Sequence, residues 1–369
     1  MKNIFYEKLA KLAVNYSVGV KKGDRVFING LSFAKELLLA IYLEVVKAGG
    51  HPLLKPDIAG TDVIFMRNAS DEQLMYYDDV MKKVMEEFDC YIAIKANANT
   101  RSLSLIDPEK LAKRQSSPKA LEVFKIFKER TAKKELRWVI VPFPTNAEAQ
   151  EADMDLFSYT EFMEKALFLD KEDPIKEWSK MQGDQAKFVD YLNKRESFQI
   201  IGEDTDLTLS TKGRVWVNSS GQVNLPDGEV FTSPVEDSVN GHIRFTYPGI
   251  YQGREIENIF LEFKDGKVIN ATADKGQELL DEILKIQNAN IMGEFAIGTN
   301  YGIQTFTKNI LFDEKLGGTI HCALGLGLPE AGGVNMSSIH WDILKDMKVS
   351  GSKILADDSI VYEEGKWKI

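Results

Sequence analysis

The first half of the chain alternates short β-type runs with amphipathic helical patterns, and this alternation restricts the possible folds more than any other feature of the sequence. The expected strands are residues 25–30, 51–54, 91–94 and 137–141, and the expected helices are residues 34–47, 71–88 and 118–133. A helix that joins two strands of one sheet places those strands parallel, so the pattern predicts a doubly wound parallel sheet. We therefore expect the chain to begin with an α/β domain.

The pattern changes after a helical, charge-rich section at residues 157–195. From about residue 198, turns of Gly, Asn and Asp separate short β-type runs, and one helical pattern interrupts them at residues 275–287. A chain of 369 residues is long enough for two domains. We predict an α/β domain at residues 1–197 and a β-rich α+β domain at residues 198–369.

Composition and charge argue against several classes of protein. The net charge is −10 and the pI is near 5.2, whereas a nucleic-acid partner normally requires a concentrated basic face. The sequence has no apolar run near 18 residues, and charged residues interrupt its first segment, so we expect neither a membrane span nor a signal peptide. Cys90 and Cys322 lie far apart in apolar runs, which argues against a disulfide framework. These features predict a cytoplasmic protein that binds neither nucleic acid nor membranes.

The segment at residues 312–342 places two of the chain's four histidines beside acidic residues. Neutral imidazole and carboxylate groups are the usual protein ligands for Zn, Co and Mn. His340 and Asp342 are two residues apart, so their side chains share one face of an extended strand. We interpret His321 and His340 as metal ligands, and His51 and His242 as structural histidines held by hydrogen bonds.

Further candidate ligands lie next to glycines or in short strands of the same half of the chain. They are Asp227, Glu229, Glu294, Asp313 and Glu314. A neighbouring glycine lets the backbone approach a metal ion closely. A single acidic residue at a turn is most often solvated or caps a helix, and the combination with two histidines is what favours metal binding.

These motifs together resemble those of the M29 metalloaminopeptidases, the thermophilic aminopeptidase family. The resemblance is most specific over NLPDGEVFTSPVEDSVNG (224–241), IMGEFAIGTN (291–300), LFDEKLGGTIHCALGLGLPEAGG (311–333) and SSIHWD (337–342). In the first half of the chain it extends to KKGDRVFING (21–30) and AGGHPLL (48–54). The resemblance therefore covers the whole chain but is sharpest after residue 200.

The resemblance implies an exopeptidase that removes N-terminal residues from peptides with two divalent ions, such as Zn, Co, Mn or Mg, held in the second, catalytic domain. Two such ions about 3.5–4 Å apart polarise a peptide carbonyl and lower the pKa of a shared water towards 7. By motif, the implied metal ligands are Glu229, Glu294, Glu314, His321, His340 and Asp342. We also expect Glu294 to accept a proton from the attacking water, and the resemblance implies a homodimer.

One position departs from the family pattern. Leu328 stands in GLGLPE where the family has a tyrosine. The resemblance implies that the hydroxyl of this tyrosine stabilises the tetrahedral intermediate. Loss of one such donor typically costs about 10²–10³ in rate. Tyr301 or Tyr251 is a candidate replacement, with Tyr301 preferred as a catalytic residue, although an ordinary packed tyrosine is the simpler interpretation of each. The alternative function is a catalytically weakened homologue that binds metal and captures peptides.

Two other interpretations of the sequence are weaker. The glycines at residues 325–333 are not followed by the Lys-Ser/Thr of a phosphate-binding loop. The α/β half lacks the G-x-G-x-x-G fingerprint of a dinucleotide site, so an oxidoreductase rests on fold analogy alone.

Overall fold

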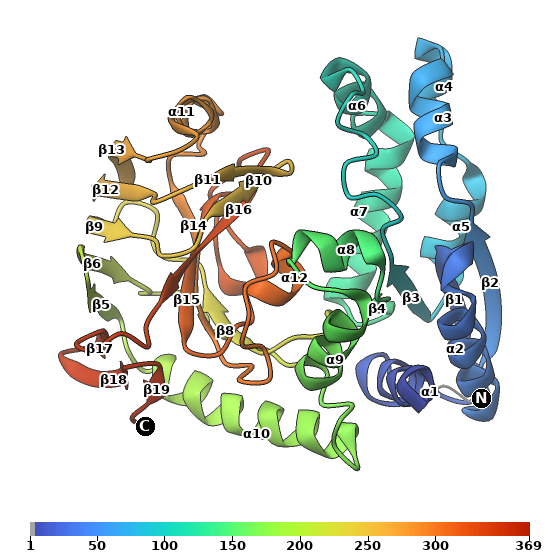
Figure 1. Ribbon diagram of the computed structural model, residues 1–369, viewed down its shortest axis with the longest axis horizontal. Coiled ribbons are helices and arrows are strands. Elements are labelled where there is room, and N and C mark those ends of the chain that lie inside the picture. The colour runs from blue at the N-terminus through green and yellow to red at the C-terminus, as the bar shows by residue number, and fades with distance from the viewer. Residues whose placement is uncertain (1–3) are drawn as a thin grey trace. The chain divides into compact units, whose positions relative to one another are not determined.

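The computed structural model describes residues 4–369, which divide into two compact units. The first unit is the chain up to Ile175 together with Gly221–Pro226, and the second is Lys176–Ser220 together with Asp227–Ile369 (Figure 1). This division differs from the predicted one mainly at residues 176–197. The predicted domain boundary after residue 197 stays a prediction.

The first unit is built on a parallel sheet with strand order β2-β1-β3-β4. Its strands are β1 (Arg25–Leu31), β2 (His51–Asp57), β3 (Cys90–Lys95) and β4 (Arg137–Pro142). The chain steps from β1 outward to β2 and then returns to the other side of β1, which is the doubly wound arrangement. This confirms the predicted α/β fold class for the first half of the chain.

Helices connect and cover these strands. They are α1 (Ile4–Lys11), continued by a π-helical segment (Leu12–Ser17), a 3₁₀ turn (Ser32–Ala34), α2 (Lys35–Lys47), α3 (Thr61–Asn68), α4 (Asp71–Met75), α5 (Asp79–Glu87), α6 (Pro108–Gln115), α7 (Pro118–Ala132), α8 (Asn146–Glu151) and α9 (Leu156–Ala166). Phe27 of β1 packs with Val84 of α5 and Val123 of α7, so these two helices cover the same face of the sheet.

The helix expected at residues 71–88 is two helices in the structure. The Ser70 side chain caps α4 in a reciprocal capping box with Gln73, and the Asp78 carboxylate accepts from the Val80 amide to begin α5. A similar break divides the helical section expected at residues 157–195, because Pro174 begins the new helix α10 (Pro174–Leu192). The apolar spacing alone predicts one continuous helix in each of these sections, but residues that begin a new helix divide each section.

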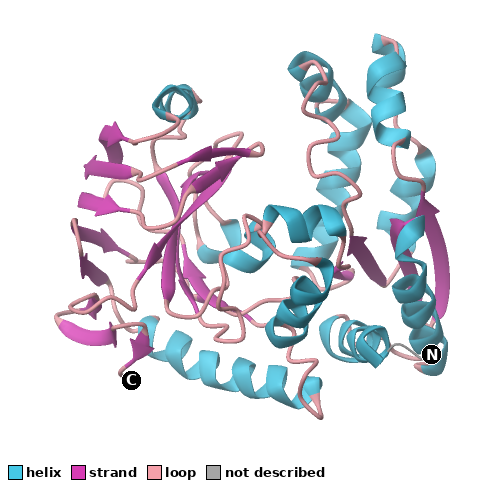
Figure 2. Cartoon of the chain, viewed as in Figure 1, coloured by secondary structure: helices cyan, strands magenta, loops and turns pink. Residues whose placement is uncertain are grey.

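The second unit consists mainly of antiparallel strands, drawn in magenta in Figure 2. One sheet has the order β13-β12-β9-β6-β5-β17-β18-β19, another has β16-β15-β14-β8-β7, and β10 pairs with β11. The strands are β5 (Ser197–Gly202), β6 (Thr205–Ser210), β7 (Val217–Ser219), β8 (Glu229–Thr232), β9 (Asn240–Arg244), β10 (Gly249–Tyr251), β11 (Arg254–Ile256), β12 (Phe260–Lys264), β13 (Lys267–Thr272), β14 (Met292–Gly298), β15 (Thr319–Gly325), β16 (His340–Asp346), β17 (Lys353–Ala356), β18 (Ser359–Glu363) and β19 (Lys366–Trp367). Besides α10, the unit contains α11 (Gln277–Lys285), α12 (Ile310–Asp313) and a 3₁₀ turn (Pro329–Ala331).

The two large sheets share one hydrophobic core. Phe198 of β5 and Leu261 of β12 meet Phe295 of β14 and Cys322 of β15 in this cluster. Because side chains alternate across a strand, residues 294, 296, 321 and 323 lie on the opposite face of β14 and β15 from this core. That second face carries the candidate ligands.

Cys90 and Cys322 are both buried free thiols, as the sequence predicted. Within residues 4–369, no helix has both the length and the apolar character that crossing a membrane requires.

Candidate metal centre

Three neighbouring strands, β14, β15 and β16, place four of the six candidate ligands on one face of their sheet. Glu229 begins the adjacent strand β8, and Glu314 follows α12. In the antiparallel register, Glu294 lies opposite Ala323, and Ala323 lies opposite Asp342. The small side chain of Ala323 leaves room between the two carboxylates. His340 pairs with Gly325 one step further along the same face, so β16 presents His340 and Asp342 together, as their spacing predicted.

A β-bulge at Gly293 determines which way Glu294 points. The register between β14 and β15 shifts between Met292 and Glu294, so Met292 faces the hydrophobic core while Glu294 faces the opposite side. A Cβ atom at Gly293 would lie 2.3 Å from the carbonyl oxygen of Leu326, so only glycine fits this position. The Ser233 hydroxyl donates to the Gly293 carbonyl over 2.7 Å and holds the bulge.

Glu294 lies between the two histidines. One carboxylate oxygen, Oε2, is 2.8 Å from His340 Nε2, and the other, Oε1, is 3.6 Å from His321 Nε2. Glu229 Oε2 is 3.4 Å from the same nitrogen of His321, and Asp342 Oδ1 is 3.5 Å from His340 Nε2 and 4.0 Å from His321 Nε2. A carboxylate with its two oxygens turned towards two imidazoles has the layout of a bridging ligand.

Three groups of three side chains within residues 4–369 have ligand atoms that all lie within 4.8 Å of one another. The groups are Glu229 with Glu294 and His321, Glu294 with His340 and Asp342, and Glu314 with His321 and Asp342. The structure therefore brings together all six side chains that the sequence analysis selected. Their role as ligands stays a prediction.

The hydrogen bonds of these residues fit a metal ion. His340 Nδ1 donates to the Leu326 carbonyl oxygen over 2.8 Å, which leaves Nε2 as the lone-pair nitrogen directed at Glu294 and Asp342. Glu229 Oε2 and Asp342 Oδ1 are buried without a hydrogen-bond partner in the described part of the chain. Lone pairs that face one another in a buried site require a cation or a proton between them.

The carboxylates around the two histidines favour the protonated form of each imidazole. Burial disfavours a charged imidazole, but Asp342 and Glu294 outweigh burial and raise the pKa of His340 to about 12. The pKa of His321 rises to about 9 against the same burial, through Glu294, Glu229 and Asp342. Burial also raises the pKa of Glu229 to about 8, while the histidines hold the pKa of Glu294 below its usual range against burial.

Lys315 is part of this cluster, and the sequence analysis missed it. Its side chain is 1% exposed, and its ammonium lies 2.8 Å from Glu229 Oε1 and also pairs with Glu314. Burial alone would lower the pKa of Lys315, but Glu229, Glu314 and Asp227 raise it well above its usual value. A lysine in a charged FDEK segment is most simply interpreted as solvated, so no sequence signal distinguished it.

The two aspartates predicted beside the ligands have other partners. The Asp313 carboxylate accepts from both the amide and the hydroxyl of Thr307, at 2.7 and 2.9 Å. Asp227 accepts from the Ser219 hydroxyl at 2.9 Å and contributes negative charge near Lys315. Both aspartates are buried and hold the loops around the cluster.

The remaining site candidates lie outside these groups. The Tyr301 hydroxyl donates to the Gly365 carbonyl over 2.7 Å, and Tyr251 packs edge-on against Trp341. Leu328 packs in a small apolar cluster with Phe231 and Ala296, and its amide donates to Ser233. Of the other two histidines, His51 is exposed on β2, and His242 lies against the Phe260 ring.

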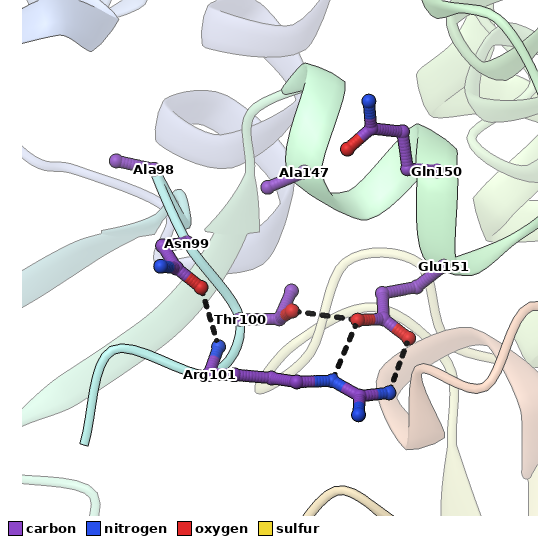
Figure 3. A pocket seen from close by; sticks show the side chains of 7 residues that line it. All are labelled: Ala98, Asn99, Thr100, Arg101, Ala147, Gln150 and Glu151. Carbon is purple, nitrogen blue, oxygen red and sulfur yellow. Dashed lines mark hydrogen bonds and ion pairs between the residues drawn. The ribbon is translucent and has the colours of Figure 1, made fainter. Parts of the chain in front are cut away.

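The first unit contains a cavity of about 460 Å³ (Figure 3). It lies between the loop that follows β3 and helix α8, near the carboxyl ends of β3 and β4, and is lined by Ala98, Asn99, Thr100, Arg101, Ala147, Gln150 and Glu151. Arg101 Nε is 3.3 Å from Glu151 Oε1, and Thr100 donates to the same oxygen over 2.8 Å. The charges of this pocket are therefore matched by one another.

A cluster of carboxylates and imidazoles, with Glu229, Glu294 and His321 buried at its centre, defines a candidate metal centre of the kind found in metal-dependent hydrolases. The family model of the thermophilic metalloprotease family M29 matches residues 4–367. The chain therefore belongs to the M29 family.

Relatives and a solved structure agree with this assignment. Aminopeptidase 2 of Geobacillus stearothermophilus is 28% identical over a match that covers 98% of this chain and 97% of that protein. Aminopeptidase AmpS of Bacillus subtilis (strain 168) is 26% identical and is matched over 99% of its length by 98% of this chain. The structure of wild-type AmpT from Thermus thermophilus superposes with a TM-score of 0.84 at 22% identity over 99% of both chains, which shows that the two share a fold.

Proposed function

We propose that this chain is a metal-dependent aminopeptidase that releases N-terminal residues from peptides through a dinuclear centre. Glu229, Glu294, Glu314, His321, His340 and Asp342 would hold two divalent ions, with Zn, Co, Mn and Mg as candidates. The single observation that carries the proposal is Glu294, whose two oxygens face two different histidines at 2.8 and 3.6 Å. Family membership and the names of the relatives support the peptide substrate class.

The positions of His340 and Glu294 indicate the role of each in the proposed reaction. When bound, the divalent ions supply a polarised carbonyl and an activated water. The Leu326 carbonyl fixes the tautomer of His340 and so aims its Nε2 into the cluster. Glu294 is buried between the two histidines, and we assign it as the acceptor of the proton from the attacking water.

The Leu328 side chain supports a second candidate function, a weakened homologue that binds metal and captures peptides. Leucine has no hydroxyl to donate, and this one packs against Phe231, Ala296 and Ala331. Tyr301 is our candidate replacement for the family tyrosine, and its hydroxyl is bonded to the Gly365 carbonyl. A Leu328→Tyr variant separates the two functions, because a large gain in turnover supports a weakened site and no gain supports chemistry without that hydroxyl.

We also propose that the protein acts as a cytoplasmic homodimer. Leu39, Leu43 and Val46 on α2 are each more than half exposed, at 52%, 53% and 51%, and their spacing forms one apolar stripe. An exposed apolar stripe on a helix whose other face is already buried supports a protein partner, and a second copy is the simplest one. The two free cysteines support a reducing compartment.

The test of the main proposal uses the full chain stripped of metal with a chelator. Zn, Co, Mn and Mg are then added back separately, and release of N-terminal residues is measured on matched unblocked and N-acetylated peptides. Cleavage that returns with metal and is confined to free amino termini supports the aminopeptidase. Stoichiometric metal binding without cleavage supports the peptide-capturing alternative, and internal cleavage of blocked peptides contradicts both.

A further inference from the structure

Lys315 places an ammonium group inside the cluster of candidate metal ligands. It is the second residue after α12, and its side chain is 1% exposed. Its Nζ donates to Glu229 Oε1 over 2.8 Å and to Glu314 Oε1. The ammonium therefore uses one oxygen from each of two carboxylates that are also candidate ligands.

Lys345 shows what an ordinary buried lysine does in the same unit. Within residues 4–369, Lys315 and Lys345 are the two buried lysines, and Lys345 is 2% exposed. Its ammonium donates to the backbone carbonyls of Glu203 and Arg244, at 3.0 and 2.9 Å. Lys345 therefore satisfies neutral backbone groups, whereas Lys315 is directed at carboxylates that we assign to metal ions.

The charges of the centre give Lys315 a consequence for metal binding. When they are ionised, the four carboxylates of the cluster, Glu229, Glu294, Glu314 and Asp342, carry four negative charges, which two divalent ions would balance. The ammonium is an additional positive charge, and Asp227 supplies the nearby negative charge that favours its staying in place. Like charges in a buried site repel strongly, so the ammonium makes binding of an ion by Glu229 less favourable.

The position of the ammonium also limits how Glu229 can bind a metal. Oε1 of Glu229 is engaged by Lys315, and Oε2 is the buried oxygen without a hydrogen-bond partner in the described residues, 3.4 Å from His321. Glu229 is therefore arranged to offer a single oxygen to the cluster. Without Lys315, both oxygens would be free to coordinate.

We propose that Lys315 is a fixed cation of the metal centre that stabilises the metal-free protein and weakens binding of the ion held by Glu229 and Glu314. This inference rests on the metal centre of the proposed function and assigns Lys315 a role in setting metal affinity. The two effects have opposite signs. Removal of the ammonium leaves carboxylates unpaired when metal is absent and removes repulsion when metal is present.

Calorimetric titration of the metal-stripped full-length protein with MnCl₂ at pH 8, together with melting temperatures with and without Mn²⁺, tests this role. For Lys315→Met we expect metal-free Tm to fall by on the order of 10 °C. We expect Mn²⁺ to bind at least about tenfold more tightly than to the wild type. The Tm gained on metal binding should therefore increase. Lys315→Gln keeps a donor near Glu229 without the charge and should show the same tightening if the methionine variant does not fold.

Lys345→Met is the matched control, since it removes the ammonium of another buried lysine, one that donates to backbone carbonyls. It should lower Tm with and without metal by similar amounts and leave the dissociation constant for Mn²⁺ unchanged. Unchanged or weaker Mn²⁺ binding by both Lys315 variants would overturn the inference while leaving the proposed metal centre intact. A wild-type protein that takes up no Mn²⁺ would instead remove the metal centre, and this inference with it.

Discussion

The metal-centre candidate of the second unit and the pocket of the first unit both contain charged side chains. These side chains differ in burial and in whether their oxygens have hydrogen-bond partners. In the pocket, Arg101 is 61% exposed as a side chain and meets Glu151 directly. In the cluster, Glu229 and Glu294 are buried, and Glu229 Oε2 has no hydrogen-bond partner in residues 4–369. Exposed charges that already match one another need no ligand, whereas buried lone pairs that face one another do.

The same contrast argues against a ligand site in the pocket, despite the position of the pocket in the sheet. The carboxyl ends of parallel strands are the usual ligand site in open α/β sheets. Here, however, the side chains of Thr100 and Arg101 both bond to the Glu151 carboxylate, as Figure 3 shows. Buried oxygens without a hydrogen-bond partner in the described residues therefore distinguish the metal-centre candidate from the pocket.

The largest expected effect is that of removing the charge of Glu294. Glu294→Gln should reduce peptide hydrolysis by at least about 10²–10³-fold, since it removes a carboxylate that we propose as both bridging ligand and proton acceptor. Metal content per chain should fall in parallel while circular dichroism stays near that of the wild type. Glu151→Gln in the pocket is the matched control and should retain both metal and activity. Full activity of Glu294→Gln would exclude Glu294 from the site.

The second prediction concerns protons in the metal-free cluster. The raised pKa values of His321, about 9, and His340, about 12, mean that both imidazoles are protonated at pH 7 when no metal is present. Metal ligands must be deprotonated, so binding should release protons, and affinity should rise by about tenfold per pH unit for each proton released. Calorimetry between pH 6 and 8 in buffers of different ionisation enthalpy measures this release. Affinity that is independent of pH would contradict the assignment of the histidines.

A smaller effect is expected beside the pocket, at Glu148. Burial raises the pKa of Glu148 to about 7, although Lys95 and a 2.8 Å hydrogen bond from Asn97 oppose the shift. The raised pKa means that the stabilisation from the neutral acid is complete below about pH 4.5 and is lost as pH rises through 7. Glu148→Gln should therefore match the wild type near pH 4.5 and exceed it by about 1–3 kcal/mol at pH 8. Urea denaturation at both pH values measures this, and a variant that is less stable at pH 8 would contradict the buried neutral acid.

The smallest effect is expected at the exposed pair itself. Arg101→Ala should change the free energy of unfolding by less than about 1 kcal/mol, because exposed ion pairs are screened by water. Metal content and hydrolysis should be unaffected. A loss of activity comparable to that of Glu294→Gln would mean that the pocket takes part in catalysis and that the contrast between the two regions is wrong.

The features of this molecule that depend on local patterns could be predicted from the sequence. The β–α alternation predicted the parallel sheet, and the two-residue spacing of His340 and Asp342 predicted their common face. Glu229, Glu294 and Glu314 were assigned through family motifs. Their side-chain directions follow from the register between distant strands, which no local pattern contains.

Features that depend on burial or on an irregular backbone were beyond the sequence. The bulge at Gly293 reverses the side of the strand on which Glu294 lies, and apolar periodicity does not predict a bulge. Lys315 gave no sign of burial, because a lysine between acidic and apolar residues is normally solvated. The Arg101–Glu151 pair joins residues 50 positions apart, so it too depends on tertiary structure.

Anomalous diffraction would show whether the six side chains around Glu294 hold two metal ions. Crystals of the protein loaded with Co²⁺ would be measured on both sides of the cobalt absorption edge. We expect two anomalous peaks among these side chains, with Glu294 between them. A single peak, or peaks elsewhere with the cluster empty, would contradict a dinuclear centre at this site.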